Sequence, residues 1–455
     1  MEARLILSAL RIRKQLRSHE RWSEPELRAF QSARLRDLRR YALAHSAFYR
    51  RFHKGVETNP LADLPVLTKA ELMANFDELV TARGVRLTDV ERHLTHLQAN
   101  ERFHDRFWVT RTSGSTGNPG IFLVDRDEWA TVIGSYARAQ EWAGVRASLT
   151  RRTRLGVVSS RVPWHQSARV GMSVDSPFVP VRRFDATQPL SEIVAGLNDW
   201  QPENLVAYAS MARLLADEQL AGRLRISPRA VMCSSEVLTP EAATRIERAW
   251  GAAPFNVYAA TETAGVASEC RNHRMHLYED LVITEVVDER NQPLPPDTVG
   301  ARVLVTVLFS RTQPLIRYEM SDRLSLSAER CGCGLPFALL AGITGRAEDS
   351  LTLHSPSGDE VVVHPVVFHR VLEPLPVREW QVDERADGLH VLLGKPVSPQ
   401  AIPPTQLAET LTRALRHLGA AVPPIVVEFV DAVPRTQLGK APQIKAMRRN
   451  RRRDS

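Results

Sequence analysis

Strand and helix patterns alternate along residues 154–260, and this alternation constrains the fold more than any other feature of the chain. The apolar runs RLGVVSS, NLVAYAS, AVMCSSE and FNVYAA have the length and composition of strands. The segments between them, SEIVAGLNDW, MARLLADEQL and PEAATRIERAWG, have the apolar spacing of amphipathic helices. This order is typical of layered α/β folds. We therefore predict that the larger part of the chain is an α/β domain.

The flanking segments predict helices before this region and a hairpin after it. Residues 2–52 repeat apolar side chains at helical spacing, and Thr68 with Glu71 forms a capping-box pattern for a further helix. The run FWVT predicts a strand, which is followed by the loop TSGSTGNPG and by a helix over 127–142. After residue 280, LVITEVVD and ARVLVTVLFS flank the turn NQPLPPDTVG and predict a β hairpin.

The last hundred residues contain enough strands and helices for a compact α+β domain. The strand patterns are LTLHS, EVVVHP, EWQVDE, GLHVLLG and IVVEFV, and the helical patterns are VVFHRVLEPL and QLAETLTRALRHLG. A chain of 455 residues also exceeds the size at which one core stops growing. We place the boundary at about Gly345, which gives an N-terminal domain over 1–345 and a C-terminal domain over 346–455.

The composition, 43% hydrophobic and 25% charged, is that of an ordinary globular protein. No apolar run approaches the roughly 20 residues of a membrane span, and LILSAL is too short for the core of a signal peptide. Four cysteines are too few for a disulfide framework in a chain of this length. We therefore expect a cytoplasmic protein.

The segment TSGSTG, which begins at residue 112, is rich in hydroxyl groups and glycine. Such a loop brings backbone N–H groups and hydroxyls close to an anion and can hold phosphates. It lacks the lysine of the GxxxxGK[ST] loop, and by composition alone a plain surface turn is an equally good interpretation. Its members are Thr112, Ser113, Gly114, Ser115, Thr116 and Gly117.

In its order and context, TSGSTGNPG resembles the phosphate-binding loop of the adenylate-forming enzymes, which include acyl-CoA synthetases, luciferases and the adenylation domains of peptide synthetases. Four further segments follow in the order of that family and together cover nearly the whole chain. The resemblance implies a ligase that uses ATP and Mg²⁺ to convert a carboxylic acid to its acyl-adenylate. It also implies a small, mobile C-terminal lid.

The resemblance assigns binding roles to two segments of the N-terminal domain. NVYAATE is similar to the motif that borders adenine and presents one glutamate, here Glu262, to Mg²⁺. SSE, after AVMC, is similar to a motif in the wall of the nucleotide pocket. The nucleotide-binding residues implied by these two segments are Ser235, Glu236, Tyr258, Ala259 and Thr261.

Three later segments complete the resemblance. RYEMSD implies that Asp322 accepts hydrogen bonds from both ribose hydroxyls, which suits the two oxygens of a carboxylate. GRAED resembles the hinge between the domains, in which Arg346 contacts the nucleotide and Glu348 or Asp349 is the pivot. The resemblance of PRTQLGK to the family's lysine motif implies that Lys440 reaches the acyl-adenylate and stabilises the negative charge that develops there. The implied catalytic residues are Lys440, Glu262 and Thr116.

Within the family, SAFYRRF, ASECRNHRMHLYEDLVITEV and ITGRAEDSL are similar to segments of phenylacetate-CoA-ligase-like proteins, and this implies CoA as the acyl acceptor. The segment LTLHSPSGDE differs from the glycine-containing segment that normally lies near the CoA channel. A carrier-protein thiol, an amine or another nucleophile is therefore the alternative acceptor. A non-catalytic sensor of a nucleotide or acyl ligand is a third interpretation, and the presence of Glu262, Asp322 and Lys440 together disfavours it.

Three cysteines and a histidine predict either a structural zinc site or free cysteines beside a surface histidine. Cys270 and His276 lie in one segment, and Cys331 and Cys333 lie in CGCG. Three thiolates and an imidazole form a closed tetrahedral site. His273 is a rival fourth ligand.

Two further features concern the partners. In RVPWHQS, His165 lies where the family builds its acyl pocket, and Trp164 beside it favours an aromatic or apolar acid. The closing RRNRRRDS belongs to a chain of net charge +8 and is more typical of a solvated tail than of a binding site for nucleic acid or an acidic carrier protein. We expect no nucleic-acid partner.

Overall fold

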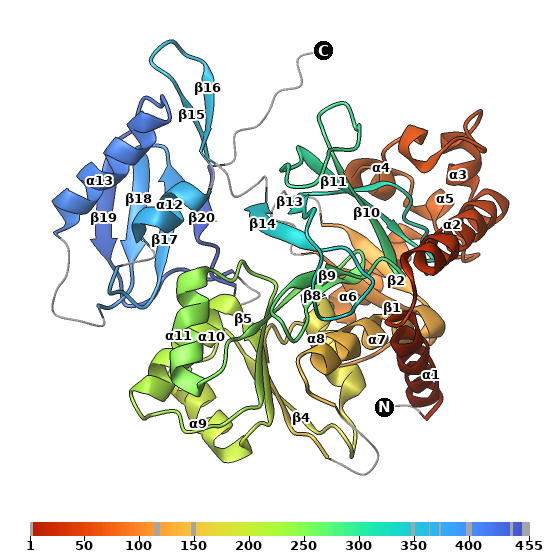
Figure 1. The fold of residues 1–455 in the computed structure, drawn as a ribbon, viewed down its shortest axis with the longest axis horizontal. Helices are drawn as coiled ribbons and strands as arrows, with labels where there is room; N and C mark the ends of the chain where they lie inside the picture. Colours follow the sequence, from red (N-terminus) through yellow and green to blue (C-terminus); the bar gives the residue numbers. More distant parts are fainter. Residues whose placement is uncertain are drawn as a thin grey trace.

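The computed structural model describes residues 3–112, 119–146, 152–346, 351–363, 365–372, 375–396, 403–436 and 440–447. Helices precede the first strands, as predicted, and the sheets and the C-terminal lobe follow (Figure 1). Thr68 and Glu71 form the predicted capping box. The N-terminal helices are α1 (Ala3–His19), α2 (Glu24–His45), α3 (Ala47–Phe52), the short 3-10 helix η1 (Leu61–Asp63), α4 (Lys69–Ala74), α5 (Phe76–Leu79) and α6 (Leu87–His96).

A seven-stranded sheet with the order β4-β3-β5-β6-β7-β8-β9 forms the centre of the larger domain. The strands from β4 to β7 are parallel, and β8 and β9 are antiparallel additions at one edge. This confirms the predicted α/β class. The strands are β3 (Leu155–Ser159), β4 (Val181–Asp185), β5 (Asn204–Tyr208), β6 (Ala230–Ser234), β7 (Phe255–Ala260), β8 (Ala264–Glu269) and β9 (Met275–Leu277).

Helices cover both faces of this sheet because its strands are apolar on both sides. In β6, Val231 and Cys233 pack into the cluster formed with α9, α10 and α11, whereas Met232 packs against Ala139 of α7 on the other side. This arrangement can be followed in Figure 1. The helices are α7 (Arg126–Trp142), α8 (Gln166–Val174), α9 (Leu190–Trp200), α10 (Ala209–Leu220) and α11 (Pro240–Trp250).

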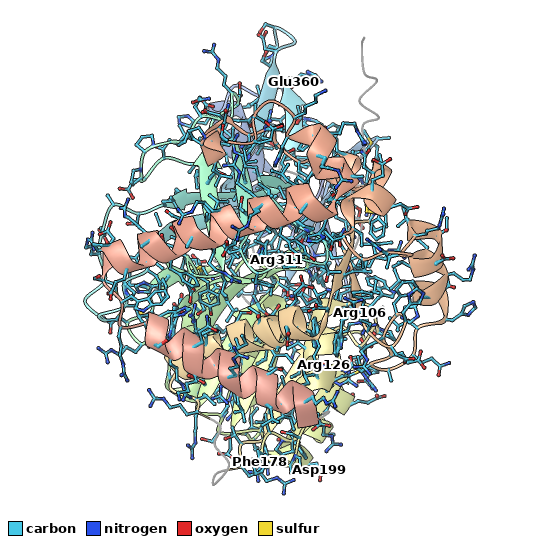
Figure 2. The ribbon with its side chains drawn as sticks, turned by 90° about the vertical axis from the view of Figure 1, so that its right-hand side faces the viewer. Arg106, Arg126, Phe178, Asp199, Arg311 and Glu360 are labelled. Atoms are coloured by element: carbon cyan, nitrogen blue, oxygen red, sulfur yellow. The ribbon has the colours of Figure 1, made fainter. Side chains whose placement is uncertain are left out.

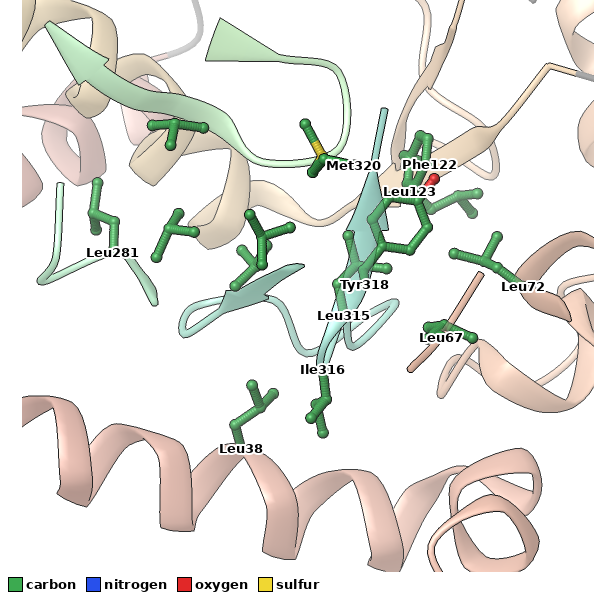
Figure 3. Close-up of a cluster of buried hydrophobic side chains, with 14 of the residues drawn as sticks. Leu38, Leu67, Leu72, Phe122, Leu123, Leu281, Leu315, Ile316, Tyr318 and Met320 are labelled. Carbon is green, nitrogen blue, oxygen red and sulfur yellow. The ribbon is translucent and has the colours of Figure 1, made fainter. Parts of the chain in front are cut away.

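The region after residue 280 is built from small antiparallel sheets. The predicted hairpin is β10 with β11, to which β12 adds a third strand. A core cluster packs these strands against α2 and the segment before α4; Figure 3 shows Leu38, Leu67 and Tyr318 within it. The strands are β10 (Val282–Val287), β11 (Arg302–Val307), β12 (Tyr318–Met320), β13 (Asp322–Leu326) and β14 (Leu340–Arg346).

The C-terminal lobe has the predicted mixture of strands and helices and a hydrophobic cluster of its own. A four-stranded sheet, with the order β19-β18-β17-β20, packs with two helices, and the hairpin β15-β16 precedes it. The predicted boundary at Gly345 stays a prediction. The elements are β15 (Leu351–His354), β16 (Glu360–Val363), α12 (Pro365–Leu372), β17 (Trp380–Arg385), β18 (Gly388–Leu393), α13 (Pro404–His417), β19 (Ile425–Phe429) and β20 (Ile444–Lys445).

Several elements were not predicted. FWVT forms β1 (Trp108–Arg111), but it pairs with β2 (Ile121–Val124) in a separate two-stranded sheet rather than leading directly into a helix. Strands β4, β8 and β9 and helix α8 were also missed. None of the described helices is long and apolar enough to cross a membrane.

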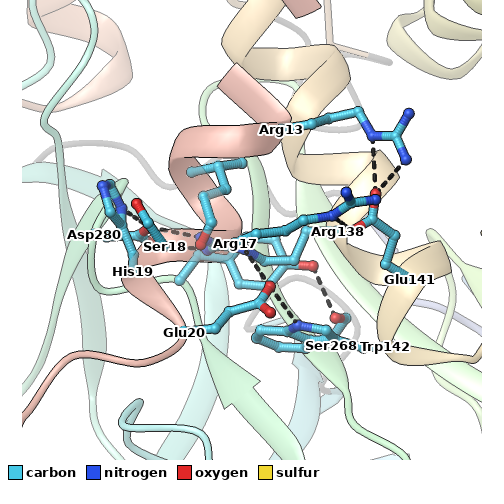
Figure 4. Close-up of polar contacts among 12 residues, drawn as sticks. Arg13, Arg17, Ser18, His19, Glu20, Arg138, Glu141, Trp142, Ser268 and Asp280 are labelled. Atoms are coloured by element: carbon cyan, nitrogen blue, oxygen red, sulfur yellow. Dashed lines mark hydrogen bonds and ion pairs between the residues drawn. The ribbon is translucent and has the colours of Figure 1, made fainter. Parts of the chain in front are cut away.

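A buried ion cluster fixes the end of α1 to the core. The carboxylate of Asp280 accepts two hydrogen bonds from Arg138, at 2.7 and 2.6 Å, and its Oδ2 lies 2.6 Å from His19 Nδ1 (Figure 4). All three side chains are buried. Burial opposes ionisation of Asp280, but Arg138 and His19 outweigh it and hold the pKa of this carboxyl at about 2. Earlier in α1, Arg13 and Arg17 pair with Glu141 of α7.

We predict that Asp280→Asn lowers the free energy of unfolding by about 3–5 kcal/mol, because the buried Arg138 guanidinium loses both of its hydrogen bonds to a carboxylate and keeps only the longer ion pair with Glu20 at 3.9 Å. Chemical denaturation at neutral pH measures this loss. The exposed variant Asp37→Asn, which breaks only a surface pair with Arg40, is the control and should cost about 1 kcal/mol or less. Equal effects of the two variants would contradict the prediction.

Because the pKa of Asp280 is lowered on folding, its contribution is complete above about pH 4 and is lost as the pH falls towards about 2. The wild type should therefore lose more stability than Asp280→Asn over this acid range.

Candidate functional site

A cavity of about 1450 Å³ collects the predicted nucleotide-binding residues that the structure describes with their side chains. It reaches from the carboxyl ends of the central strands to the C-terminal lobe. In open α/β sheets, ligands bind at this end of the strands. The predicted residues that line it are Thr112, Ser235, Glu236, Tyr258, Ala259, Thr261, Glu262, Asp322 and Lys440.

Two parts of the prediction fall outside this description. Ser113, Gly114, Ser115, Thr116 and Gly117 lie outside the described residues, as do Glu348 and Asp349. Two hydrogen bonds join the residues that flank this loop. The Thr112 N–H donates to the Gly120 carbonyl at 2.9 Å, and the Gly120 N–H donates to Thr112 Oγ1 at 2.8 Å.

The segment that carries Glu262 is a tight turn between β7 and β8, and Gln166 of α8 holds it. The amide of Gln166 is assigned with its nitrogen facing the turn and its oxygen facing Tyr136. In this orientation it donates to the carbonyls of Ala260 at 3.2 Å and Thr261 at 2.9 Å, and it accepts from the Tyr136 hydroxyl at 3.1 Å. Gln166 is buried. The sequence pattern gave no signal for this residue, because α8 was not predicted.

Tyr318 is a second residue that the sequence analysis missed. Its side chain is 1% exposed and lines the cavity, yet its hydroxyl has no hydrogen-bond partner within the described structure. Burial, followed by the negative charges of Glu262 and Glu319, raises the pKa of this hydroxyl. It therefore keeps its proton and can donate to an oxygen of a bound ligand. Its place in RYEMSD, four residues before Asp322, was the available signal.

Asp322 begins β13, directly opposite Arg346 of β14 in the antiparallel ladder. The backbone thus brings together two residues of separate predicted motifs. The Arg346 side chain lies outside the described part of the chain.

Lys440 reaches the cavity from the C-terminal lobe, and Glu236 connects its segment to the larger domain. The Glu236 carboxylate accepts the N–H of Ser210 at 2.9 Å, at the start of α10, and the N–H of Ala441 at 3.0 Å. The Lys440 Nζ lies 5.8 Å from the centre of the Tyr208 ring. Glu236, predicted only as a wall of the nucleotide pocket, also binds the segment that carries Lys440, across the two lobes.

His165 lines the same cavity close to Lys440. Burial, with a smaller effect of the Lys440 charge, lowers the pKa of its imidazole to about 3, and its Nδ1 lies 2.7 Å from Ser167 Oγ. It is therefore neutral at physiological pH. Trp164 does not line the cavity; its ring stacks with the Arg111 guanidinium instead, at 5.4 Å.

The predicted cysteine and histidine cluster forms at a separate place. The four ligand atoms of Cys270, His276, Cys331 and Cys333 lie within 4.8 Å of one another. The Sγ atoms of Cys270 and Cys331 are 3.7 Å apart, and Cys333 Sγ is 3.3 Å from His276 Nε2. His276 Nδ1 faces the Phe337 carbonyl at 2.8 Å, which directs Nε2 towards the thiols. The rival ligand His273 pairs with Glu269.

Solved structures share this fold. A 2-hydroxyisobutyryl-CoA ligase in its postadenylation state aligns with a TM-score of 0.71 over 95% of this chain and 91% of that chain, at 21% identity. The same ligase in its thioesterification state gives a TM-score of 0.58 over 94% and 91% of the two chains, at 20% identity. The fold is thus that of the two-domain CoA ligases, as predicted.

Sequence comparison finds phenylacetate-coenzyme A ligases among the relatives of this chain. A phenylacetate-coenzyme A ligase of Thermus thermophilus is 27% identical over 80% of this chain and 79% of its own length. Another, of Aromatoleum evansii, is 26% identical over 93% of this chain and 95% of its own length. No family model matches the chain. The predicted resemblance to the phenylacetate-CoA-ligase-like branch of the adenylate-forming enzymes is confirmed.

We predict that Glu236→Ala slows adenylation by about 10- to 100-fold, which corresponds to losing one hydrogen bond to a charged acceptor. The exchange of pyrophosphate into ATP measures this rate, and the exposed Glu241→Ala, on the neighbouring helix, is the control. ATP affinity should change little, because the lost hydrogen bond to Ala441 holds the C-terminal lobe rather than the nucleotide. A parallel loss of ATP affinity would mean that Glu236 acts on the nucleotide instead.

Proposed function

We propose that this protein is an AMP-forming carboxylate ligase that converts an acid and Mg-ATP to an acyl-adenylate and pyrophosphate, and then transfers the acyl group to CoA with release of AMP. The observation that carries the proposal is the convergence of Glu262, Asp322 and Lys440 on one cavity from three separate parts of the chain. The names of the curated relatives support the same reaction.

The cavity offers a group for each part of the substrate. Asp322 has two acceptor oxygens for the ribose hydroxyls, and Glu262 would hold the Mg²⁺ of Mg-ATP, which would supply positive charge beside the phosphates. Lys440 and the Tyr318 hydroxyl stabilise charge on the oxygens as carboxylate attacks the α-phosphorus and pyrophosphate leaves. The His165 imidazole is neutral, so in this proposal Lys440 is the cation beside the carboxylate of the acid substrate.

CoA is the proposed acceptor. A carrier-protein thiol or an amine is the alternative, because the segment LTLHSPSGDE after the hinge motif differs from the glycine-containing segment of the family. An acyl-adenylate formed on the enzyme can be offered CoA, a carrier protein bearing phosphopantetheine, and simple amines in competition. Preferential formation of the CoA thioester supports the proposal, and preference for another acceptor would replace its second step.

Removal of the lysine tests the first step. We expect Lys440→Ala to lower the rate of acid-dependent exchange of pyrophosphate into ATP by about 10²- to 10³-fold, the range for losing one preorganised charge-stabilising group. Lys445→Ala, a nearby lysine that is absent from the cavity wall, is the control and should retain exchange.

Exchange that survives Lys440→Ala would contradict the assigned role of this lysine. If wild-type protein binds ATP but supports no exchange with any acid, the sensor interpretation gains support.

We also propose a structural zinc ion at Cys270, His276, Cys331 and Cys333. Tetrahedral bonds of about 2.3 Å place two sulfurs about 3.8 Å apart, close to the 3.7 Å between Cys270 and Cys331. The contact of His276 with the Phe337 carbonyl is the type of contact that orients zinc-bound imidazoles. Such an ion would join β9 to the segment before β14, and none of its four ligands lines the cavity.

Metal analysis of protein purified without a chelator should give one zinc per chain. Cys333→Ser should lose zinc and melt at a lower temperature, whereas Cys233→Ala, outside the cluster, should retain the metal. Absence of zinc from the wild type would refute the site.

A further inference from the structure

The cavity continues beyond the adenylation residues as an apolar arm. Here we define the apolar arm by six lining residues: Leu10 of α1, Ala137 of α7, Val157 of β3, Val170 and Val174 of α8, and Phe178 of the loop before β4. One turn further along the two helices, Arg13 and Glu141 also line the cavity, and their charges pair with each other. His165 and Gln166, at the start of α8, lie between this arm and the turn that carries Glu262. The arm is thus continuous with the proposed adenylation site.

The far end of the arm lies at the surface. Leu10 and Phe178 line the cavity and are also 38% and 39% exposed to solvent. Figure 2 shows α1 lying across the face of the molecule whose lower end carries Phe178. An apolar ligand longer than the arm could therefore extend outward without a clash at a closed end.

Helix α1 is a fixed wall of the arm. It packs so closely on α7 that a Cβ added to Gly134 would lie 2.6 Å from Ile12 Cγ2. The Asp280 cluster holds its last residue, and Glu141 of α7 binds Arg13 and Arg17. The arm is therefore preformed rather than dependent on folding of the N-terminus around a ligand.

The volume of the cavity is large enough for a nucleotide and an acid side by side. Pockets for one drug-sized ligand measure about 300–1,000 Å³, whereas this cavity measures about 1450 Å³. A nucleotide held by Asp322 and Glu262 leaves the arm vacant.

We propose that the acid activated here has a long apolar chain, with its carboxylate near Lys440 and its tail in the apolar arm between α7, α8 and α1. This inference rests on the proposed function and specifies its substrate class. A short aryl acid would fill only the part of the cavity near His165.

The test is pyrophosphate exchange with straight-chain acids from butyrate to dodecanoate and with phenylacetate. Each methylene moved from water into the arm should lower KM about fourfold until the chain reaches the mouth, where the gain ends. A short acid or phenylacetate that is used at least as well as the long acids would overturn the inference and leave the proposed function intact.

Two variants locate the effect in the arm. Ala137→Phe narrows the arm beside α7 and should shift the preference towards shorter acids. Leu10→Asp places a charge at the mouth and should raise KM for the longest acids by at least tenfold. Leu7→Asp is its matched control, because Leu7 lies on the same helix, is 67% exposed and does not line the cavity. Thermal melting confirms that each variant folds.

Calorimetric binding of the same acids decides the inference if no acid supports exchange. Affinity that rises with chain length in the wild type, but not in Ala137→Phe, supports the arm even though the proposed function would then fail. Affinity independent of length, or equal effects of Leu10→Asp and Leu7→Asp, would overturn it.

Discussion

The Glu236 carboxylate is the contact on which the assembled site depends. Its two oxygens accept one N–H from the start of α10 and one from Ala441, so a single side chain joins the larger domain to the segment that carries Lys440. The Arg213 guanidinium, which donates to the Val377 carbonyl at 2.6 Å, and the ion pair of Arg378 with Glu218 also join the two lobes, but Glu236 is the contact next to Lys440. The bond is also of a kind that can break and re-form, as a lid that serves two successive reactions requires.

Polar contacts also fix the other end of the cavity. The buried Asp280 carboxylate binds Arg138 and His19, and this holds α1 where it forms a wall of the apolar arm. Burying these charges is costly unless they pair, so the arrangement tolerates little change. The cavity therefore combines the polar residues Asp322 and Glu262 with the apolar arm, and charged groups from distant parts of the sequence position both.

Local patterns in the sequence were sufficient to predict most of the fold and several residues that line the candidate site. The apolar runs of β3, β5, β6 and β7 and the helices between them have strong periodicity, and order-dependent motifs identified Asp322 and Lys440. Short elements such as β2, β9 and α8 have too few residues for a periodic signal. The contacts of Gln166 reach across the fold, and no single segment contains them. Tyr318 lies within the RYEMSD motif, but the burial of its hydroxyl is a property of the folded chain. The meeting of Cys270 with Cys331 likewise required the fold, since the sequence gave only two separate pairs.

The central claim is that one cavity holds the acyl-adenylate between Asp322, Glu262 and Lys440. The most direct measurement is a crystal structure with a non-hydrolysable adenosine sulfamate of the acid. We expect both oxygens of Asp322 to accept the ribose hydroxyls, with Lys440 at the sulfamate and the acyl group directed past His165. An adenosine bound away from Asp322, or a sulfamate out of reach of Lys440, would contradict the account.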